Sequence, residues 1–255
     1  IMNSIHLNAQ IGEGTTVGAF SVVEENVKIG DNCWIGPNVT IMDGARIGDN
    51  CRVFPGAVIS AIPQDLKYKG EDTLAEIGSN TTIRECVTIN KGTTDRHTTK
   101  VGDNCLLMAY VHIAHDTFVG NNCIIANSAN IAGHVDIEDW VIIEGVVAIQ
   151  QFVTIGQHAF IGGGSHVRKN VPPFIKAARE PLSYVGVNSI GLRRRGFENE
   201  VVASIEDIYR ALYVHSNNIT QAVKAAEMEL PSSKSKDLIL NFIRNSDKGI
   251  IRGPF

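Results

Sequence analysis

Aliphatic residues recur at every sixth position over most of this chain. Steps of six from Ile5 to Val167 visit 28 positions, and 25 of them are Ile, Val or Leu; the exceptions are Asp65, Glu71 and Asp95. Those three residue types make up 66 of the 255 residues, so chance would place only about seven of them there. An α-helix repeats about every 3.6 residues and a flat strand about every two. A period of six excludes both as the main element of the fold.

Turn-forming residues follow the aliphatic positions. Ten of the 25 aliphatics are followed directly by Gly, as at Gly12, and Asn often lies three residues after the aliphatic, as at Asn32 and Asn104. Both residue types form tight turns at low cost. One inward aliphatic and one turn in each six residues describe a short strand and a corner, so three units close an 18-residue triangular coil. The sequence therefore predicts a parallel β-helix, whose hand the period alone does not decide.

The composition agrees with such a rod. Isoleucine outnumbers leucine by 31 to 11, and β-branched side chains suit pleated strands. No apolar run reaches the roughly 20 residues of a membrane helix, and Ile1 to Gln10 lacks the apolar core of a signal peptide. With a net charge of −4 and five cysteines, we expect a cytoplasmic protein with no transmembrane segment and no nucleic-acid partner.

Two polar segments interrupt the repeat, and a different pattern follows it. The period breaks at 61–75 and 91–100 and then restarts in register, so we expect loops there that project from the rod and could carry binding residues. From Phe197 to Tyr213, and again further on, apolar residues recur at helical spacing. We expect a mainly β fold, with a β-helix over 1–187 and a C-terminal α-helical domain of three or four helices over 188–255.

Residues 18 apart stack on neighbouring coils, so spatial pairs can be read from the sequence where no loop intervenes. The pairs that carry chemistry are His115 with Gly133, Asp116 with His134, His112 with Asn130, and Gly145 with Gly163. Histidine is the natural base near neutral pH, and a glycine beside it leaves a backbone N–H open to a developing oxyanion. This cluster favours acyl transfer over the alternative of solvent-facing histidines at turns. Because the outer face of one rod is not a pocket, we expect a cleft between subunits of an oligomer.

Other ligand classes have weaker signals. His112 and His115 are three residues apart on a non-helical backbone, with no accompanying Cys or second close His pair, so we expect no metal. The run Arg193, Arg194 and Arg195 indicates a local anion site.

Several segments together resemble one enzyme family. They are VHIAHD at 111–116, PQDLKY at 63–68, AGH at 132–134, GVN at 186–188 and GLRRRGF at 191–197. They closely resemble the acyl carrier protein-dependent UDP-N-acetylglucosamine O-acyltransferases of lipid A biosynthesis, over nearly the whole chain. The resemblance implies a left-handed β-helix, a homotrimer with active sites between subunits, and a C-terminal helical domain.

The resemblance also implies a reaction and its participants. A 3-hydroxyacyl chain would pass from acyl carrier protein to the 3-hydroxyl of UDP-N-acetylglucosamine, the first step of lipid A biosynthesis. No cofactor is implied beyond the carrier protein's phosphopantetheine thioester, which is a co-substrate. His115 would be the general base, Asp116 its orienting neighbour, and the Gly133 N–H the oxyanion donor.

The remaining implied site residues fall into three groups. Those at positions that bind the sugar, nucleotide, phosphates or pantetheine are Gln64, Asp65, Lys67, His112, His134, Gln151, Asn188, Arg194 and Arg195. Those that would limit acyl-chain length are Gly145, Phe160 and Gly163, where the small Gly163 favours a longer chain and Phe160 could offset it. Lys169 and Arg193 could meet the acidic carrier protein.

Two departures from the family pattern leave acceptor details open. Gln150 stands where the family often has His, and Ile190 stands where some members have Glu near the uridine. A related acyltransferase acting on a 3-amino UDP-sugar is one alternative. A zinc-dependent hydratase of the γ-carbonic anhydrase type is another.

Overall fold

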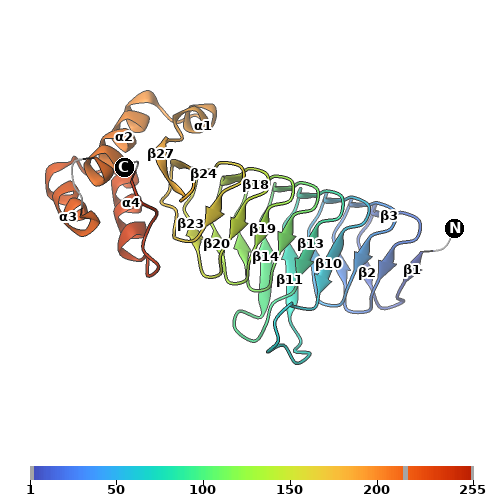
Figure 1. Cartoon of the computed structure of the whole chain (residues 1–255). Coiled ribbons are helices and arrows are strands. Elements are labelled where there is room, and N and C mark those ends of the chain that lie inside the picture. Colours follow the sequence, from blue (N-terminus) through green and yellow to red (C-terminus); the bar gives the residue numbers. More distant parts are fainter. Residues whose placement is uncertain (1–2, 215–217, 254–255) are drawn as a thin grey trace.

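The computed structural model describes residues 3–214 and 218–253, which form a three-sided rod with helices at one end (Figure 1). Sheet A, with nine strands, contains β1 (Ser4–Ile5), β4 (Val22–Val23), β7 (Thr40–Ile41), β10 (Val58–Ala61), β13 (Thr88–Asn90), β16 (His112–Ile113), β19 (Asn130–Ile131), β22 (Ala148–Ile149) and β25 (His166–Val167). Sheet B, with eight, contains β2 (Gln10–Ile11), β5 (Lys28–Ile29), β8 (Ala45–Ile47), β11 (Leu74–Ile77), β14 (Thr98–Val101), β17 (Phe118–Val119), β20 (Asp136–Ile137) and β23 (Thr154–Ile155).

Sheet C, with ten strands, completes the rod. It contains β3 (Thr16–Val17), β6 (Trp34–Ile35), β9 (Arg52–Val53), β12 (Thr82–Ile83), β15 (Leu106–Leu107), β18 (Ile124–Ile125), β21 (Ile142–Ile143), β24 (Phe160–Ile161), β26 (Ile175–Ala178) and β27 (Ser183–Val187). The chain visits sheets A, B and C in turn, so it crosses three edges in each coil, which we call the AB, BC and CA edges. All strand pairs are parallel except β26 with β27.

The predicted 18-residue register is confirmed. His112 pairs with Asn130 and Ile113 with Ile131, each one coil apart. Most inward aliphatics, such as Ile113 and Ile131, are fully buried and stack along the axis, whereas Ile5 at the open end of the rod is 39% exposed. Each such side chain contributes about 1.5–3 kcal/mol of hydrophobic stabilisation. A second apolar residue two positions earlier, such as Val111 or Ala129, is also fully buried, so most six-residue units contribute two side chains to the core.

Asparagine forms the turn at many of the corners, as its spacing after the aliphatic residues predicted. Asn32, Asn50, Asn104 and Asn122 have φ of 54°, 57°, 56° and 57°. Asparagine adopts this left-handed conformation more readily than other residues with a side chain. The same corner position carries Trp140 and His158 further along the BC edge, and these rings extend outward there.

Two connections on the AB edge are longer than the rest. Residues 62–73 join β10 to β11, and residues 91–97 join β13 to β14, so both segments are slightly shorter than the polar stretches of the sequence. Figure 1 shows both projecting from the middle of the rod, in the teal to green part of the chain. Register survives them, since Ile77 pairs with Ile47 and with Val101.

Within the described residues, four helices follow the last strand: α1 (Ser189–Arg194), α2 (Asn199–Tyr213), α3 (Ile219–Glu229) and α4 (Lys234–Arg244). α2 buries one apolar face that includes Ile205 and Tyr209, whose hydroxyl donates to the Pro173 carbonyl at the end of the rod. The predicted division of the chain at 187/188 lies between β27 and α1 and stays a prediction as a domain boundary. No helix in the described part of the chain is both long and apolar enough to cross a bilayer.

Candidate active site

The AB edge collects most of the residues singled out in the sequence. His115 and Asp116 follow β16, Gly133 and His134 follow β19, and Gln151 follows β22, each one coil further along. The segments 62–73 and 91–97 leave the rod on this same edge. Stacking of equivalent turns therefore brings together groups that are far apart in sequence.

His115 and Asp116 form a buried pair at the centre of this edge. The His115 Nδ1 lies 2.8 Å from the Asp116 Oδ2, and the two residues are 5% and 0% exposed. Asp116 has φ of 57°, which turns the chain sharply after His115 and brings its carboxylate back to the preceding ring. A carboxylate at Nδ1 favours the tautomer that has its hydrogen on Nδ1 and leaves Nε2 free to accept a proton.

Asp116 is held in its charged form. Burial raises the pKa of this carboxyl, but hydrogen bonds from His115, from Thr93 and from the Arg96 backbone lower it by more, so the net shift is downward. Among these donors are the Thr93 hydroxyl at 2.7 Å and the Thr93 N–H at 2.9 Å. An ionised Asp116 is the form that stabilises an imidazolium at His115.

Gly133 makes room for the His115 ring. A β-carbon on Gly133 would lie 2.7 Å from Cε1 and 2.8 Å from Nε2 of His115, closer than such atoms approach in proteins. The 18-residue spacing predicted this stacked pair, and we expected the glycine to leave a backbone N–H open to an oxyanion. The structure adds that the His115 ring occupies the space where a side chain at position 133 would lie. The Gly133 N–H has no hydrogen-bond partner within residues 3–214 and 218–253, which leaves a donor beside the ring.

His134 lies beside the pair on the next coil. Its ring meets that of His115 edge-on at 5.1 Å and stacks on Phe152 at 4.6 Å. Its Nε2 is 3.9 Å from Asp116 Oδ2. Its Nδ1 is 3.0 Å from Asp95 Oδ2 but lacks the alignment of a hydrogen bond, so this nitrogen is buried without a hydrogen-bond partner. His134 is therefore held by stacking more than by polar contacts.

His112 lies on sheet A, beside the AB edge. Its Nδ1 is 2.7 Å from the Thr88 hydroxyl on the preceding coil. Burial lowers the pKa of His112, and the nearby His115 lowers it further. His112 is consequently suited to hydrogen bonding as a neutral ring near pH 7.

The three predicted residues of the 62–73 segment lie on the same edge but apart from this cluster. Gln64 and Lys67 are exposed, and Asp65 accepts a hydrogen bond from the Lys67 N–H at 2.9 Å within the loop. Gln151 is also exposed, and its carbonyl accepts from the Lys248 ammonium at the C-terminal end. These side chains are free to reach a bound molecule.

Asn188 and Arg195 meet on the BC edge. The Asn188 side chain donates to the His158 carbonyl at 3.0 Å, and Arg195 Nη1 lies 3.1 Å from His158 Nδ1. The Arg195 guanidinium also lies over the Trp140 ring at 5.3 Å. Burial, and then the charge of Arg195, lowers the pKa of His158 to about 4. A neutral His158 can therefore accept from this arginine and fix its direction.

The rest of α1 is more open. Arg193 and Arg194 are exposed, with Arg193 donating to the Asn199 side chain at 3.0 Å. Ile190, one of the two departures from the family pattern, is 65% exposed. Gln150, the other, is also exposed. Neither departure disturbs the packing of the rod.

The three residues implied in chain-length selection lie away from His115. Gly145 and Gly163 stack on the CA edge, where a β-carbon on Gly163 would lie 3.3 Å from the Gly145 carbonyl oxygen. The Gly163 N–H donates to Glu144 at 2.8 Å. Phe160 lies on sheet C in β24, half-buried. Within one chain, the base and these residues therefore belong to different edges of the rod.

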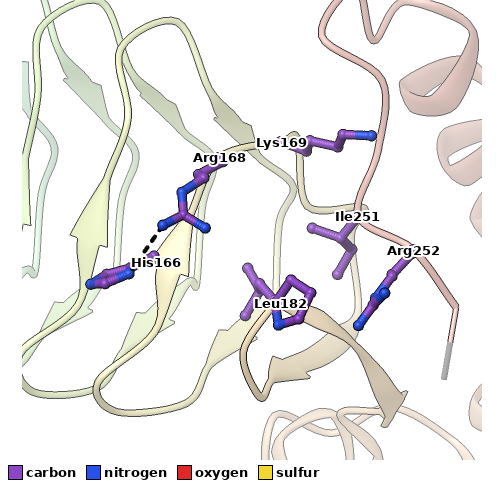
Figure 2. Close-up of a pocket in the computed structure, with 7 residues that line it drawn as sticks. His166, Arg168, Lys169, Leu182, Ile251 and Arg252 are labelled. Atoms are coloured by element: carbon purple, nitrogen blue, oxygen red, sulfur yellow. Dashed lines mark hydrogen bonds between the residues drawn. The ribbon is translucent and has the colours of Figure 1, made fainter. Parts of the chain in front are cut away.

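A small basic cavity lies at the junction of rod and helical end. It measures about 250 Å³ and is lined by His166, Arg168, Lys169, Pro181, Leu182, Ile251 and Arg252. Figure 2 shows Lys169 on a turn at the end of the rod and Arg252 on the segment after the last helix. Arg168 is paired with Glu180 at 3.0 Å. The cavity adds a positively charged surface beyond the last coil of the AB edge.

One cluster in the described chain could in principle hold a metal. His115, Asp116 and His134 place one ligand atom each within 4.8 Å of one another. The 18-residue spacing paired Asp116 with His134, but the metal expectation considered only the spacing of His112 and His115. Both Asp116 oxygens already accept hydrogen bonds from Thr93, and Oδ2 also accepts from His115. That arrangement favours a hydrogen-bonded acid–base group over a metal ligand.

Sequence reasoning missed the residues that surround this group. Thr93, Asp95 and Arg96 all contact Asp116 or His134 from the 91–97 segment. The one available signal was that this segment interrupts the repeat next to His115. His158, which contacts both Asn188 and Arg195, was missed because it occupies an ordinary corner position.

Comparison with known proteins identifies the same features. Residues 170–251 match the family model described as UDP N-acetylglucosamine O-acyltransferase, domain 2. Residues 8–33, 26–61 and 98–133 match the bacterial transferase hexapeptide repeat. The repeat found in the sequence and the helical end thus correspond to two known family signatures.

Relatives match over most of the chain. A protein of Herminiimonas arsenicoxydans is 44% identical over 251 residues, covering 96% of this chain and 95% of its own length, and one of Halorhodospira halophila is 43% identical over 197 residues, 77% and 76% of the two chains. Both are named acyl-(acyl-carrier-protein)–UDP-N-acetylglucosamine O-acyltransferase. Neither name supports the 3-amino acceptor or the zinc hydratase.

Solved structures agree. The UDP-N-acetylglucosamine acyltransferase of Bacteroides fragilis superposes with a TM-score of 0.96 at 49% identity over 98% of both chains. The Francisella novicida enzyme gives 0.93 at 36% identity over 99% of this chain and 93% of that one. This agreement confirms the left-handed β-helix with C-terminal helices. The chain belongs to the family of acyl-(acyl-carrier-protein)–UDP-N-acetylglucosamine O-acyltransferases.

Proposed function

We propose that this enzyme transfers a 3-hydroxyacyl chain from acyl carrier protein to the 3-hydroxyl of UDP-N-acetylglucosamine, the first step of lipid A biosynthesis. The observation that carries the proposal is the buried His115–Asp116 pair, with Nδ1 and Oδ2 2.8 Å apart, packed against Gly133. This group has the parts that acyl transfer to an alcohol needs: a base, a residue that orients it, and a neighbouring N–H.

His115 acts as the general base. Its Nε2 takes the proton of the sugar 3-hydroxyl as the oxygen attacks the thioester carbonyl carbon, and Asp116 stabilises the imidazolium that forms. The tetrahedral intermediate then collapses: the carbon–sulfur bond breaks, and the proton passes from His115 to the leaving phosphopantetheine sulfur. The ester of the sugar and the free thiol are the products, so atoms and charge balance without a cofactor.

Gly133 contributes the oxyanion donor through its backbone N–H, which has no partner in the described chain. The other assigned residues hold substrate around this centre. His134 and Gln151 lie on the AB edge, and His112 lies beside it on sheet A. Together with Gln64, Asp65 and Lys67 of the loop, they are assigned to the sugar, the phosphates or the pantetheine. Asn188, Arg194 and Arg195 serve the nucleotide.

A homotrimer with sites between subunits explains the distribution of these residues. The base lies on the AB edge and Gly163 on the CA edge, so one rod alone does not form a groove that joins them. The outward positions of sheet C form an apolar row that would suit packing against a second copy: Leu106, Ile124, Ile142 and Phe160 pair in register. On the same coils, the outward positions of sheet B form a more polar row of Lys100, Phe118, Asp136 and Thr154.

The carrier protein docks next to the helical end. Lys169 and Arg252 line the basic cavity of Figure 2, and Arg193 is exposed on α1. A positive surface there suits an acidic carrier protein whose pantetheine then extends along the AB edge. The expected cytoplasmic location accords with a carrier protein as donor.

A transfer assay with purified protein tests the proposal. His115→Ala should lose nearly all ester formation from 3-hydroxyacyl carrier protein and UDP-N-acetylglucosamine, because removing a positioned base costs about 10²–10⁴-fold. His6→Ala, an exposed histidine at the other end of the rod, is the matched control and should keep full activity. Retained turnover in His115→Ala would remove the assigned base.

A further inference from the structure

We propose that Thr93 and Arg96, on the segment between β13 and β14, are positioning residues that set the orientation of His115 by holding Asp116. The inference rests on the proposed function, in which His115 is the base. It concerns a loop that the repeat does not require, since coils elsewhere on the AB edge turn within four residues, as between β19 and β20.

Four donors converge on the Asp116 carboxylate, and they are divided between its two oxygens. Oδ1 accepts from the Thr93 N–H at 2.9 Å and from the Arg96 N–H at 3.1 Å. Oδ2 accepts from the Thr93 hydroxyl at 2.7 Å and lies 2.8 Å from His115 Nδ1. Rotation of the carboxylate would break several charge-assisted hydrogen bonds at once, so Oδ2 stays directed at the imidazole.

The backbone of Asp116 is held in the same place. Its N–H donates to the Thr99 hydroxyl at 2.8 Å, and its carbonyl accepts from Arg96 Nη1 at 3.2 Å. Asp116 also has the uncommon left-handed backbone conformation. With side chain and main chain both fixed, the residue has little freedom to follow a displaced histidine.

The Arg96 side chain ties this segment to the rod. Its guanidinium makes two hydrogen bonds to Asp136, at 2.7 and 3.0 Å, and lies over the Phe118 ring at 4.8 Å. Phe118 and Asp136 pair on adjacent strands of sheet B. A long polar connection would otherwise sample many conformations at low cost. The bidentate contact therefore keeps the two backbone N–H groups and the Thr93 hydroxyl in position before substrate arrives.

The orientation matters for proton transfer. Asp116 at Nδ1 keeps the proton there and leaves Nε2 as the acceptor, and loss of a donor would make the carboxylate more basic. A more basic Asp116 protonates at higher pH, which raises the pH below which activity is lost. The other titratable or charged groups facing the pair are Asp95, Arg96, His112, His134 and Asp136.

The test compares three threonine variants of the full-length enzyme. Thr93→Val keeps the β-branched shape and removes the hydroxyl, which donates to Asp116 at 2.7 Å and accepts from the Asp95 N–H at 3.2 Å, whereas Thr93→Ser keeps the hydroxyl. Thr81→Val is the matched control: Thr81 is also fully buried on the rod, donates to the Gly102 carbonyl at 2.9 Å, and lies outside the site. The readouts are kcat, KM for UDP-N-acetylglucosamine, the pH profile of kcat/KM, and the ¹⁵N shifts of the His115 ring.

Thr93→Val should lower kcat by about tenfold, the loss of one hydrogen bond to a charged group. It should leave KM nearly unchanged, move the acidic limb of the profile to higher pH, and broaden the ¹⁵N signals of the His115 ring as the Asp116 carboxylate gains freedom to rotate. Thr93→Ser should restore most of kcat. Thr81→Val should lower stability only. A wild-type kcat and an unmoved acidic limb in Thr93→Val would overturn the proposal, as would equal losses in Thr93→Val and Thr93→Ser.

Arg96→Gln provides a second route if Thr93→Val does not fold. Its side chain is only partly buried and lies outside the core. Loss of the tie to Asp136 should lower kcat several-fold and broaden the His115 ring signals, and unchanged values of both would contradict the proposal. The ring signals are measured without substrate, so they test the positioning role independently of activity. A wild-type enzyme that makes no sugar ester would count against the proposed function and not against the positioning role.

Discussion

The ring of His115 packs directly against the backbone of Gly133, which lies one coil further along the rod. A side chain at position 133 would not fit between them. A β-carbon at position 133 would be 2.7 Å from the ring Cε1. This contact, produced by an 18-residue repeat, joins the proposed base to the proposed oxyanion donor.

Gly133→Ala should displace His115 and lower kcat by about 100-fold, since a shift of about 1 Å at a reacting group can cost that much. The new methyl group would contact the ring at Cε1 and Nε2, so the ring must move away from the N–H beside it. Steady-state kinetics measure the loss, and thermal unfolding checks the fold. A variant that folds and keeps wild-type kcat would show that the ring position is not critical.

Gly163→Met should shift donor preference toward shorter acyl chains. The methionine side chain would extend from the CA edge into the proposed acyl groove, and its β-carbon would lie 3.3 Å from the Gly145 carbonyl oxygen, a tight contact. Exclusion of three methylenes, each worth about 0.8 kcal/mol, would cost a long chain about 50-fold in relative kcat/KM. Competition between donors of different length measures this ratio, and turnover of the short donor is the internal control. An unchanged ratio would separate Gly163 from chain selection.

Lys169→Glu should raise KM for acyl carrier protein by about tenfold, because a positive group on the docking surface becomes negative. KM for the UDP-sugar should stay the same. Lys28→Glu, the same charge change on sheet B in the N-terminal half of the rod, is the control. Equal effects of both variants would indicate a response to net charge and not a docking site.

His158 should make stability fall in mild acid. Its pKa of about 4 in the folded enzyme is below its ordinary value of 6.5, so between these values the unfolded chain binds the proton and the folded chain does not. Stability is therefore lost as pH falls below 6.5, by about 2 kcal/mol at pH 5 from this group. Denaturant unfolding at pH 7 and pH 5 measures how much unfolding free energy is lost on acidification. That loss should be about 2 kcal/mol smaller in His158→Phe than in the wild-type enzyme, and equal to the wild-type loss in His6→Phe. A wild-type pH dependence in His158→Phe would contradict the assignment.

The repeat made the rod predictable because each coil repeats the same physical solution. One buried aliphatic and one cheap turn in six residues recur, so the pairing of His112 with Asn130 could be read from numbering alone. The same arithmetic placed His115 against Gly133. The hand of the coil could not be read this way, because the period is identical for either hand.

The parts of the site that were not predicted from the sequence depend on contacts that the six-residue repeat does not encode. Thr93 and Arg96 lie on an inserted segment whose path is decided by individual hydrogen bonds to Asp116 and Asp136. The 18-residue spacing also does not give the direction of the His115 ring, so it did not predict that Gly133 makes room for that ring. The three residues implied in chain-length selection lie away from the AB edge that carries His115, and the expectation that sites form between subunits stays a prediction.

The central claim is acyl transfer to a sugar hydroxyl, and mass spectrometry of the product tests it most directly. Purified enzyme would be incubated with UDP-N-acetylglucosamine and a mixture of 3-hydroxyacyl carrier proteins. The expected result is a single sugar nucleotide product carrying one 3-hydroxyacyl ester on the 3-hydroxyl, absent with His115→Ala. Failure of the folded wild-type enzyme to form any acylated sugar nucleotide would contradict the claim.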